Sequence, residues 1–161
     1  MNLYIRQRIF SWTDSYDVYD ETGEARYEVR AALFSLGHQI HVYDKRAAEG
    51  FNEVGCIRQK LFALLPTFEI EINGQIVGTI QKKFTLFRQN YLVDYRGWDV
   101  EGDVMGWDYR VMEHGREVVS ISKEFFQLSN TYVLRYHNSA NEIPGLLLVL
   151  AIDAANCDHN D

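Results

Sequence analysis

One apolar pattern recurs along this chain of 161 residues. The stretch Ile5–Trp12 reads IRQRIFSW, and the stretch Ile57–Leu64 reads IRQKLFAL. Extending that match without gaps gives five copies, which begin at Ile5, Val29, Ile57, Ile80 and Ile121. Apolar residues stand four, seven, eleven and thirteen places past each start, and a weaker sixth copy begins at Val100 but has Glu113 at its thirteenth place. Repetition of this kind predicts a small structural unit that is used several times.

Each unit reads as strand, short turn and strand. The first offsets would also suit a helical heptad, but turn-forming residues stand eight to ten places past each start, as in Thr13–Ser15 and Arg88–Asn90. Beyond the turn the apolar residues fall two apart, which is the period of a strand. Hairpin signals at Asn73-Gly74 and His114-Gly115 separate the units. Six units of two strands predict about twelve antiparallel strands.

The longest uninterrupted apolar run, Leu146–Ile152, stands close to the end of the chain. Twelve strands with one apolar face could close into a barrel, which has no exposed edges but leaves an interior to be filled. As a helix, residues 146–157 would be about 18 Å long, and Pro144 would fall in the first turn, where proline is tolerated. A helix that is apolar on every side is a buried helix.

A thirteenth strand inside the sheet is the alternative structure for this run. Ala151, Ala154 and Ala155 favour the helix, because alanine has the highest helix propensity. We therefore predict a mainly β fold, a closed antiparallel barrel of roughly twelve strands that encloses a buried hydrophobic C-terminal helix. The residues predicted to fill the barrel are Leu146, Leu147, Leu148, Val149, Leu150, Ala151 and Ile152.

Length, charge and cysteine usage narrow the class of protein. A chain of this length without a linker rich in Ser, Gly or Pro is expected to form a single domain, residues 1–161. The net charge of −7 argues against general nucleic-acid binding. The seven-residue apolar run is far shorter than the ~20 residues that span a bilayer, and no signal-peptide core is found near the start. With Cys56 and Cys157 expected as reduced thiols, we predict a cytoplasmic protein without a transmembrane segment.

Four segments give the chain a resemblance to a known family. They are Thr67–Phe87, Val100–Val111, Val119–Phe126 and Leu150–Asp161. Taken in order, and with this ending, they resemble the LURP-one-related family, which has the tubby C-terminal-like fold. The resemblance implies an antiparallel barrel threaded by a C-terminal hydrophobic helix. It implies no established catalytic activity and no cofactor.

The same resemblance suggests what kinds of ligand to consider. Tubby relatives bind phosphoinositides through basic residues on the barrel exterior. Phospholipid scramblases, which look like more distant relatives, use an acidic calcium-binding stretch before their helix. The corresponding stretch here, His137–Gly145, contains one acid, Glu142. This departure from the scramblase pattern argues against calcium-dependent lipid scrambling by this chain.

Basic residues cluster in the third and fourth units. Arg58 and Lys60 would share one face of a strand, whereas Lys82 would share a face with Ile80, so that Lys83 would point outward. With Arg88, these exterior cations could hold a phosphorylated lipid head group. A solvated strand exterior is the alternative, because exposed lysine is common.

Residues with other chemistry are sparse. Asp153, Cys157 and His159 are weak candidates for a zinc site, since the first two stand four apart on one helical face. Glu101, Asp103 and Asp108 could perform acid–base chemistry, but the glycines between them more simply mark a hairpin. No catalytic constellation or phosphate-binding loop is found.

These observations favour a non-catalytic binding or scaffold module. We expect it to recognise a phosphoinositide or other lipid head group, or a protein partner, on the barrel exterior or at a barrel mouth. The alternative is a small-molecule-binding protein or hydrolase-like enzyme with a pocket at one barrel end.

Overall fold

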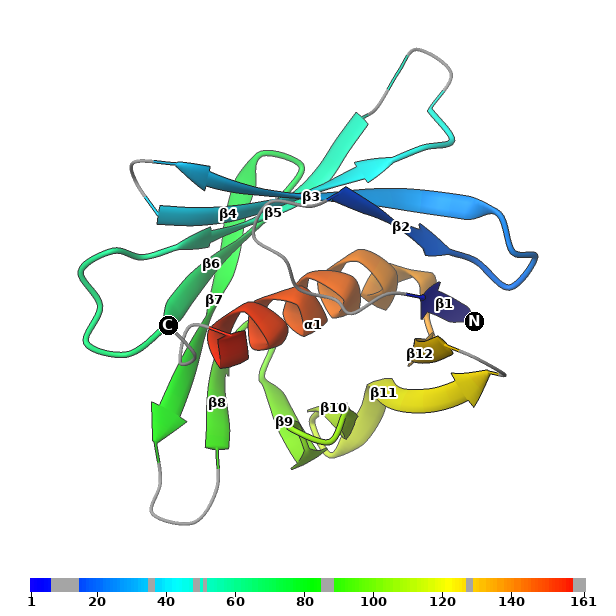
Figure 1. The fold of residues 1–161 in the computed structure, drawn as a ribbon. Coiled ribbons are helices and arrows are strands. Elements are labelled where there is room, and N and C mark those ends of the chain that lie inside the picture. Colours follow the sequence, from blue (N-terminus) through cyan, green and yellow to red (C-terminus); the bar gives the residue numbers. More distant parts are fainter. Residues whose placement is uncertain are drawn as a thin grey trace.

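The computed structural model describes residues 1–6, 15–34, 37–47, 50, 52–84, 89–126 and 129–157. Within them the chain forms twelve strands, a short 3-10 turn and one α-helix (Figure 1). The strands are β1 (Asn2–Ile5), β2 (Ser15–Tyr19), β3 (Ala25–Phe34), β4 (Gly37–Asp44), β5 (Asn52–Gln59), β6 (Thr67–Ile72), β7 (Gln75–Phe84), β8 (Gln89–Asp94), β9 (Trp98–Asp103), β10 (Asp108–Glu113), β11 (Arg116–Phe126) and β12 (Ser129–Tyr136). The 3-10 turn η1 covers Ser139–Asn141, and the helix α1 covers Glu142–Cys157.

The strands form one antiparallel sheet that curls into a nearly closed barrel (Figure 1). The hydrogen-bonded order is β8-β7-β6-β5-β4-β3-β2-β1-β12-β11-β10-β9. Its two end strands, β8 and β9, are consecutive in sequence and lie side by side. They are joined by a tight turn, in which the Trp98 N–H donates to the Tyr95 carbonyl at 2.9 Å. The predicted fold class is confirmed. Within the described residues, the sheet has one seam, between β8 and β9, where neighbouring strands are not paired.

The repeat found in the sequence is the hairpin of this barrel. In all five copies the first residue and the residue thirteen places later are direct cross-strand partners. The pairs are Ile5–Val18, Val29–Val42, Ile57–Ile70, Ile80–Val93 and Ile121–Leu134. All ten side chains are buried in the barrel interior, so each pair fixes the register of its hairpin. In the sixth copy the partners are Val100 and Val111, eleven apart. The paired residues are thus two places closer in sequence than in the other copies, and Glu113, thirteen places past Val100, faces Trp98 instead.

The apolar residues of the intervening places are not all in the core. In the third copy, Leu61 and Leu64 occupy the fourth and seventh places, and both are exposed in the loop between β5 and β6. Ile9, Trp12, Leu36, Phe87 and Leu128 lie outside the described residues. Because Leu61 and Leu64 belong to a loop, the helical-heptad interpretation is wrong there.

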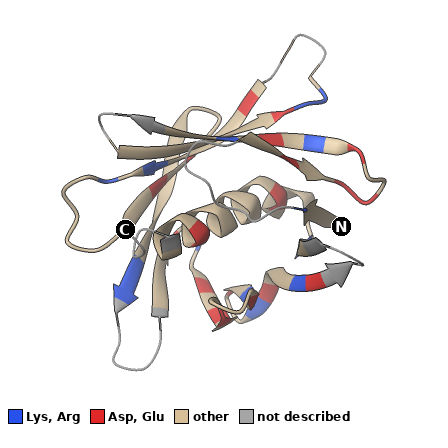
Figure 2. Ribbon diagram, in the orientation of Figure 1, with Lys and Arg blue, Asp and Glu red and all other residues tan. Residues whose placement is uncertain are grey.

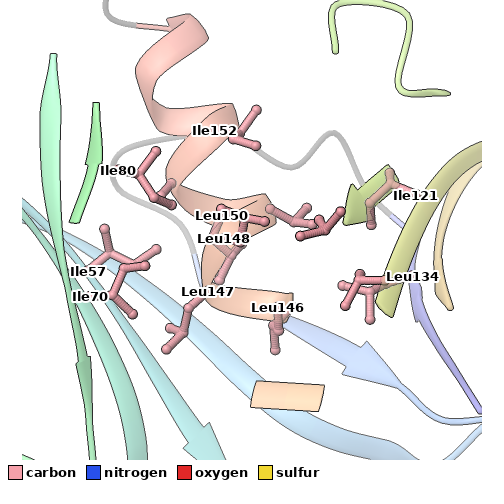
Figure 3. Close-up of a cluster of buried hydrophobic side chains, with 14 of the residues drawn as sticks. Ile57, Ile70, Ile80, Ile121, Leu134, Leu146, Leu147, Leu148, Leu150 and Ile152 are labelled. Atoms are coloured by element: carbon pink, nitrogen blue, oxygen red, sulfur yellow. The ribbon is translucent and has the colours of Figure 1, made fainter. Parts of the chain in front are cut away.

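Helix α1 fills the barrel (Figure 1). The seven residues from Leu146 to Ile152 are at most 1% exposed, as predicted. Figure 3 shows helix side chains directed both to the wall that carries Ile57 and Ile80 and to the opposite wall with Ile121 and Leu134. Full burial stabilises each such large apolar side chain by about 1.5–3 kcal/mol relative to exposure. Because this run forms a helix, the alternative of a thirteenth strand is wrong.

Polar contacts fix both ends of α1. At its start, the Glu142 carboxylate lies 2.6 Å from Arg26 Nε and accepts hydrogen bonds from the hydroxyls of Tyr27 (2.5 Å) and Tyr136 (2.8 Å). At its end, the buried Lys82 ammonium donates to the Ala155 carbonyl at 3.1 Å. A carboxylate in the first turn and a cation at the last carbonyls both match the helix dipole. Glu142, the single acid of the stretch compared with scramblases, is thus an anchor of the helix.

Candidate functional site

The C-terminal ends of the odd-numbered strands and the N-terminal ends of the even-numbered strands lie along one edge of the barrel, because consecutive strands are antiparallel. We call this edge the loop rim. The C-terminal end of α1 reaches it, since Lys82, near the end of β7, bonds to Ala155. The Tyr91 hydroxyl, near the start of β8, also donates to the Asn156 side chain there. The barrel mouth at the loop rim is thus occupied by the helix end.

The β5–β6 connection presents an apolar surface at the loop rim. We call Leu61, Phe62, Ala63 and Leu64 the apolar loop; all four residues are exposed, and Phe62 and Leu64 completely so. The loop is closed at its base by the Lys60 N–H, which donates to the Thr67 carbonyl at 2.9 Å. Exposed apolar residues that are grouped on one loop, as these are, favour a binding surface. This surface could not be found from the sequence, because the repeat placed Leu61 and Leu64 in a strand that ends at a turn over residues 65–67.

The predicted basic residues are placed differently from one another. Arg58 Nε lies 3.1 Å from a Glu71 oxygen, and Lys60 Nζ lies 3.4 Å from Glu69, so β6 neutralises both cations. Lys83 is exposed close to the end of β7. Arg88 lies outside the described residues. The structure therefore brings Arg58 and Lys60 together on the barrel exterior, but as members of ion pairs.

Lys82 and Lys83 point in opposite directions, as the strand period predicts. The Lys82 side chain is 1% exposed and its ammonium bonds to Ala155, so it is part of the core. The Lys82 N–H also donates to the Pro66 carbonyl at 2.9 Å, which holds the end of β7 beside the apolar loop. Lys83 is the next residue along β7. In Figure 2 these two lysines form the blue band at the end of β7.

A second polar cluster lies inside the barrel around Asp153. Burial raises the pKa of Asp153 to about 7. Burial, reinforced by the Asp153 charge, also raises the pKa values of Tyr16 on β2, Tyr91 on β8 and Tyr109 on β10. Within the described part of the chain, Asp153 Oδ2 accepts no hydrogen bond. The proposed partners Cys157 and His159 cannot be placed, since the Cys157 side chain and all of His159 lie outside the described parts.

The acidic residues of the β9–β10 hairpin have a local role. Glu101, Asp103 and Asp108 are all exposed, and Asp103 pairs with Asp108 across the hairpin. Asp103 Oδ1 accepts a hydrogen bond from the Gly106 N–H at 2.9 Å, which closes the turn. These carboxylates support the hairpin interpretation of the glycines.

A mixed group of side chains lies on the outer face of β4 and β5. His41 Nδ1 is 3.2 Å from a Glu53 carboxylate oxygen, and the buried Cys56 is the direct cross-strand partner of His41. Burial raises the pKa of the Cys56 thiol to about 12. Sequence analysis did not associate these residues, because a single sequence gives no strand register.

No helix in the described ranges is long and apolar enough to cross a membrane. The described part of the chain thus offers three candidate surfaces or clusters: the apolar loop with its lysines, the interior of the barrel around Asp153, and the group on β4 and β5.

Comparison with known proteins places the chain in a family. The LURP-one-related family profile matches residues 1–153. The uncharacterised protein YxjI of Bacillus subtilis is 27% identical over 135 residues, which cover 84% of this chain and 81% of YxjI. The crystal structure of an Arabidopsis thaliana protein, AT5G01750, superposes with a TM-score of 0.63 at 15% identity, covering 95% of this chain and 90% of that one. That likeness shows a shared fold. On its match to the family profile over nearly its whole length, the chain belongs to the LURP-one-related family.

Proposed function

We propose that this protein is a non-catalytic binding module that docks on an anionic lipid surface through the apolar loop and the lysines beside it. The observation that carries the proposal is the full exposure of Phe62 and Leu64 on one loop. Lys60 stands at the base of that loop, and Lys83 stands on the strand held against it by Pro66. Apolar side chains flanked by lysine are the usual composition of a membrane-interface contact.

The energies fit a reversible attachment. Burying Phe62 and Leu64 in the acyl boundary would contribute about 1.5–3 kcal/mol for each side chain. Each lysine near an anionic surface would add about 1 kcal/mol. Opposing terms are the ion pair between Lys60 and Glu69 and the net charge of −7, which repels an anionic membrane at long range. Binding should therefore be weak, local to this rim and sensitive to salt.

Because the interior of the barrel is filled, a ligand is expected to bind on the exterior. Leucines and alanines of α1 occupy the space that a ligand would need in an open barrel, and the side chains from Leu146 to Ala151 are fully buried there. The helix end also blocks the mouth at the loop rim through the Lys82 and Tyr91 contacts. An enzyme or carrier with a pocket inside the barrel is less compatible with this packing.

Vesicle co-sedimentation tests the proposal. The full chain is mixed with phosphatidylcholine vesicles, with and without phosphatidylserine or a phosphatidylinositol phosphate, at low and high salt. We expect binding only with anionic lipid and loss at high salt. The double variant Phe62→Ser and Leu64→Ser removes about 3 kcal/mol or more, so its partition coefficient should fall about 100-fold. Lys83→Glu should weaken binding about 30-fold, because it removes an attraction of about 1 kcal/mol and adds a repulsion of about the same size.

Matched controls come from the opposite edge of the barrel. Ile76 is 60% exposed close to the β6–β7 hairpin, and Lys45 follows β4. Ile76→Ser and Lys45→Glu should bind as the unmodified chain does. Equal losses for Ile76→Ser and for the Phe62/Leu64 variant would contradict the assignment to the apolar loop. Absence of binding to any anionic vesicle would remove the lipid proposal and favour a protein partner for the same surface.

A further inference from the structure

Three side chains with metal-binding atoms of different kinds converge on the outer face of β4 and β5. They are His41, Glu53 and Cys56, and their imidazole nitrogen, carboxylate oxygen and sulfur atoms all lie within 4.8 Å of one another. His41 Nδ1 lies 3.2 Å from Glu53 Oε1. This is the one group of three such residues within the described parts of the chain.

The strand register creates the group. His41 on β4 faces Cys56 on β5 directly, and the register then shifts between Val42 and Tyr43, so that Tyr43 faces Glu53. Regular alternation would place Glu53 on the side opposite to Cys56, because successive residues of a strand point to opposite faces. The bulge adds one residue to β5 and turns Glu53 to the same outer face as His41 and Cys56.

The residues inside the bulge confirm this assignment of faces. A Cβ added to Gly55 would lie 2.7 Å from Leu147 Cδ1, so Gly55 points at the helix. Val54 also packs against the hydrophobic core. Two consecutive residues thus face inward, and Cys56 and Glu53 on either side of them face outward. Similar register shifts occur at Val18/Tyr19 and Ile70/Glu71. The bulge is therefore a recurring feature of this barrel, whereas the combination of histidine, glutamate and cysteine belongs to this bulge.

The surroundings leave the group approachable by a cation. The neighbouring cations have carboxylate partners of their own: Arg58 lies 3.1 Å from Glu71, and Arg30 lies 2.7 Å from Glu28. The His41 and Tyr43 rings are stacked at 6.3 Å between centroids, which holds the imidazole orientation. Glu53 and His41 are partly exposed, whereas Cys56 forms the closed floor of the site.

We propose that His41, Glu53 and Cys56 bind one zinc ion, with a water molecule at the fourth position. Zinc accepts thiolate, imidazole and carboxylate together, and three protein ligands with one open position are a common zinc arrangement. Ligand atoms bound at 2.0–2.3 Å in a tetrahedron lie about 3.5 Å apart, which small side-chain rotations here would reach. The Cys56 thiol gives its proton to solvent as the zinc–sulfur bond forms. This proposal does not depend on lipid binding.

Cobalt substitution tests the proposal on the full chain. After chelator treatment and desalting, the protein is titrated with Co²⁺, whose bond to a thiolate gives a charge-transfer absorption in the near ultraviolet. We expect one Co²⁺ per chain, displacement of Co²⁺ by Zn²⁺, and no charge-transfer band in Cys56→Ser. Glu53→Gln should bind Co²⁺ at least about tenfold more weakly, because a charged ligand is lost.

Two control variants separate this site from its competitors. Cys157→Ser should keep the band, and Glu69→Gln, which alters another exterior carboxylate of the same sheet, should keep the affinity. A band that survives Cys56→Ser, or that disappears in Cys157→Ser, would overturn the proposal, as would the absence of any band in the unmodified chain. If Cys56→Ser fails to melt cooperatively, Glu53→Gln decides: an unchanged affinity in that folded variant refutes the site.

Discussion

Replacing Asp153 by asparagine should make the protein more stable at neutral pH, by an amount that depends on pH. Asp153 is 6% exposed among Tyr16, Tyr91 and Tyr109, and burial raises its pKa from 3.8 to about 7. Its carboxyl group therefore favours the protonated form in the folded protein. In the unfolded chain the same group ionises near pH 4. Folding thus takes up a proton between these two pH values.

The sign and size of the change in the free energy of unfolding follow from the linkage between proton binding and folding. Between pH 4 and pH 7 the folded state binds one proton more than the unfolded state, so the free energy of unfolding falls by about 1.4 kcal/mol for each pH unit. Above pH 7 the loss levels off at about 4 kcal/mol, the free energy of a shift of this size. Asparagine is neutral at every pH and has nearly the same shape. Asp153→Asn should therefore resemble the unmodified protein near pH 4 and exceed it by up to about 4 kcal/mol at pH 8.

Urea denaturation from pH 4 to pH 8 measures this difference. Asp108→Asn, an exposed carboxyl on β10, is the control and should show no comparable trend. A constant difference across the range, or a less stable Asp153→Asn protein at pH 8, would refute the reasoning. Such a result would mean that Asp153 is held ionised in the folded protein.

The helix and its anchor give further predictions. Leu148→Asp should prevent cooperative folding, because an unpaired charge in the barrel interior costs several kcal/mol; a cooperatively melting variant by circular dichroism would show that α1 is dispensable. Glu142→Gln should lower the free energy of unfolding by about 2–4 kcal/mol, since it leaves the Arg26 guanidinium without its carboxylate. Urea denaturation measures that loss, and an exposed change such as Glu21→Gln should be close to neutral.

The fold could be predicted because two independent sequence signals agree. The spacing of thirteen between paired apolar residues, as in Ile57 and Ile70, is set by hairpin length and strand period. The apolar run from Leu146 has no polar face, so only an enclosed position suits it. The seam between β8 and β9 was not predicted, because the apolar pattern specifies which residues face inward and not which neighbouring backbones form hydrogen bonds.

The candidate sites could be predicted from the sequence less well than the fold. Arg58 and Lys60 were placed correctly on one exterior face, but their pairing with Glu71 and Glu69 depends on the register of β6 against β5. The repeat wrongly placed Leu64 in a strand, because an apolar residue in a loop fits the same spacing as one in a strand. The association of His41 with Cys56 needs the register of two strands, which no local pattern in the sequence contains.

A barrel filled by its own chain restricts where function can be located. In a barrel of this size the interior is normally the place for a ligand, but here the side chains of α1 take that space and the Lys82 and Tyr91 contacts close the loop rim around its end. Variation that leaves the core intact is therefore confined to loops and outward-facing residues. The apolar loop and the group on β4 and β5 both meet that condition: neither contributes a side chain to the pairs that fix hairpin register. Phe62 and Glu53, which are exposed or partly exposed, can thus be altered without unfolding the barrel, so a binding defect after Phe62→Ser or Glu53→Gln can be assigned to the site itself.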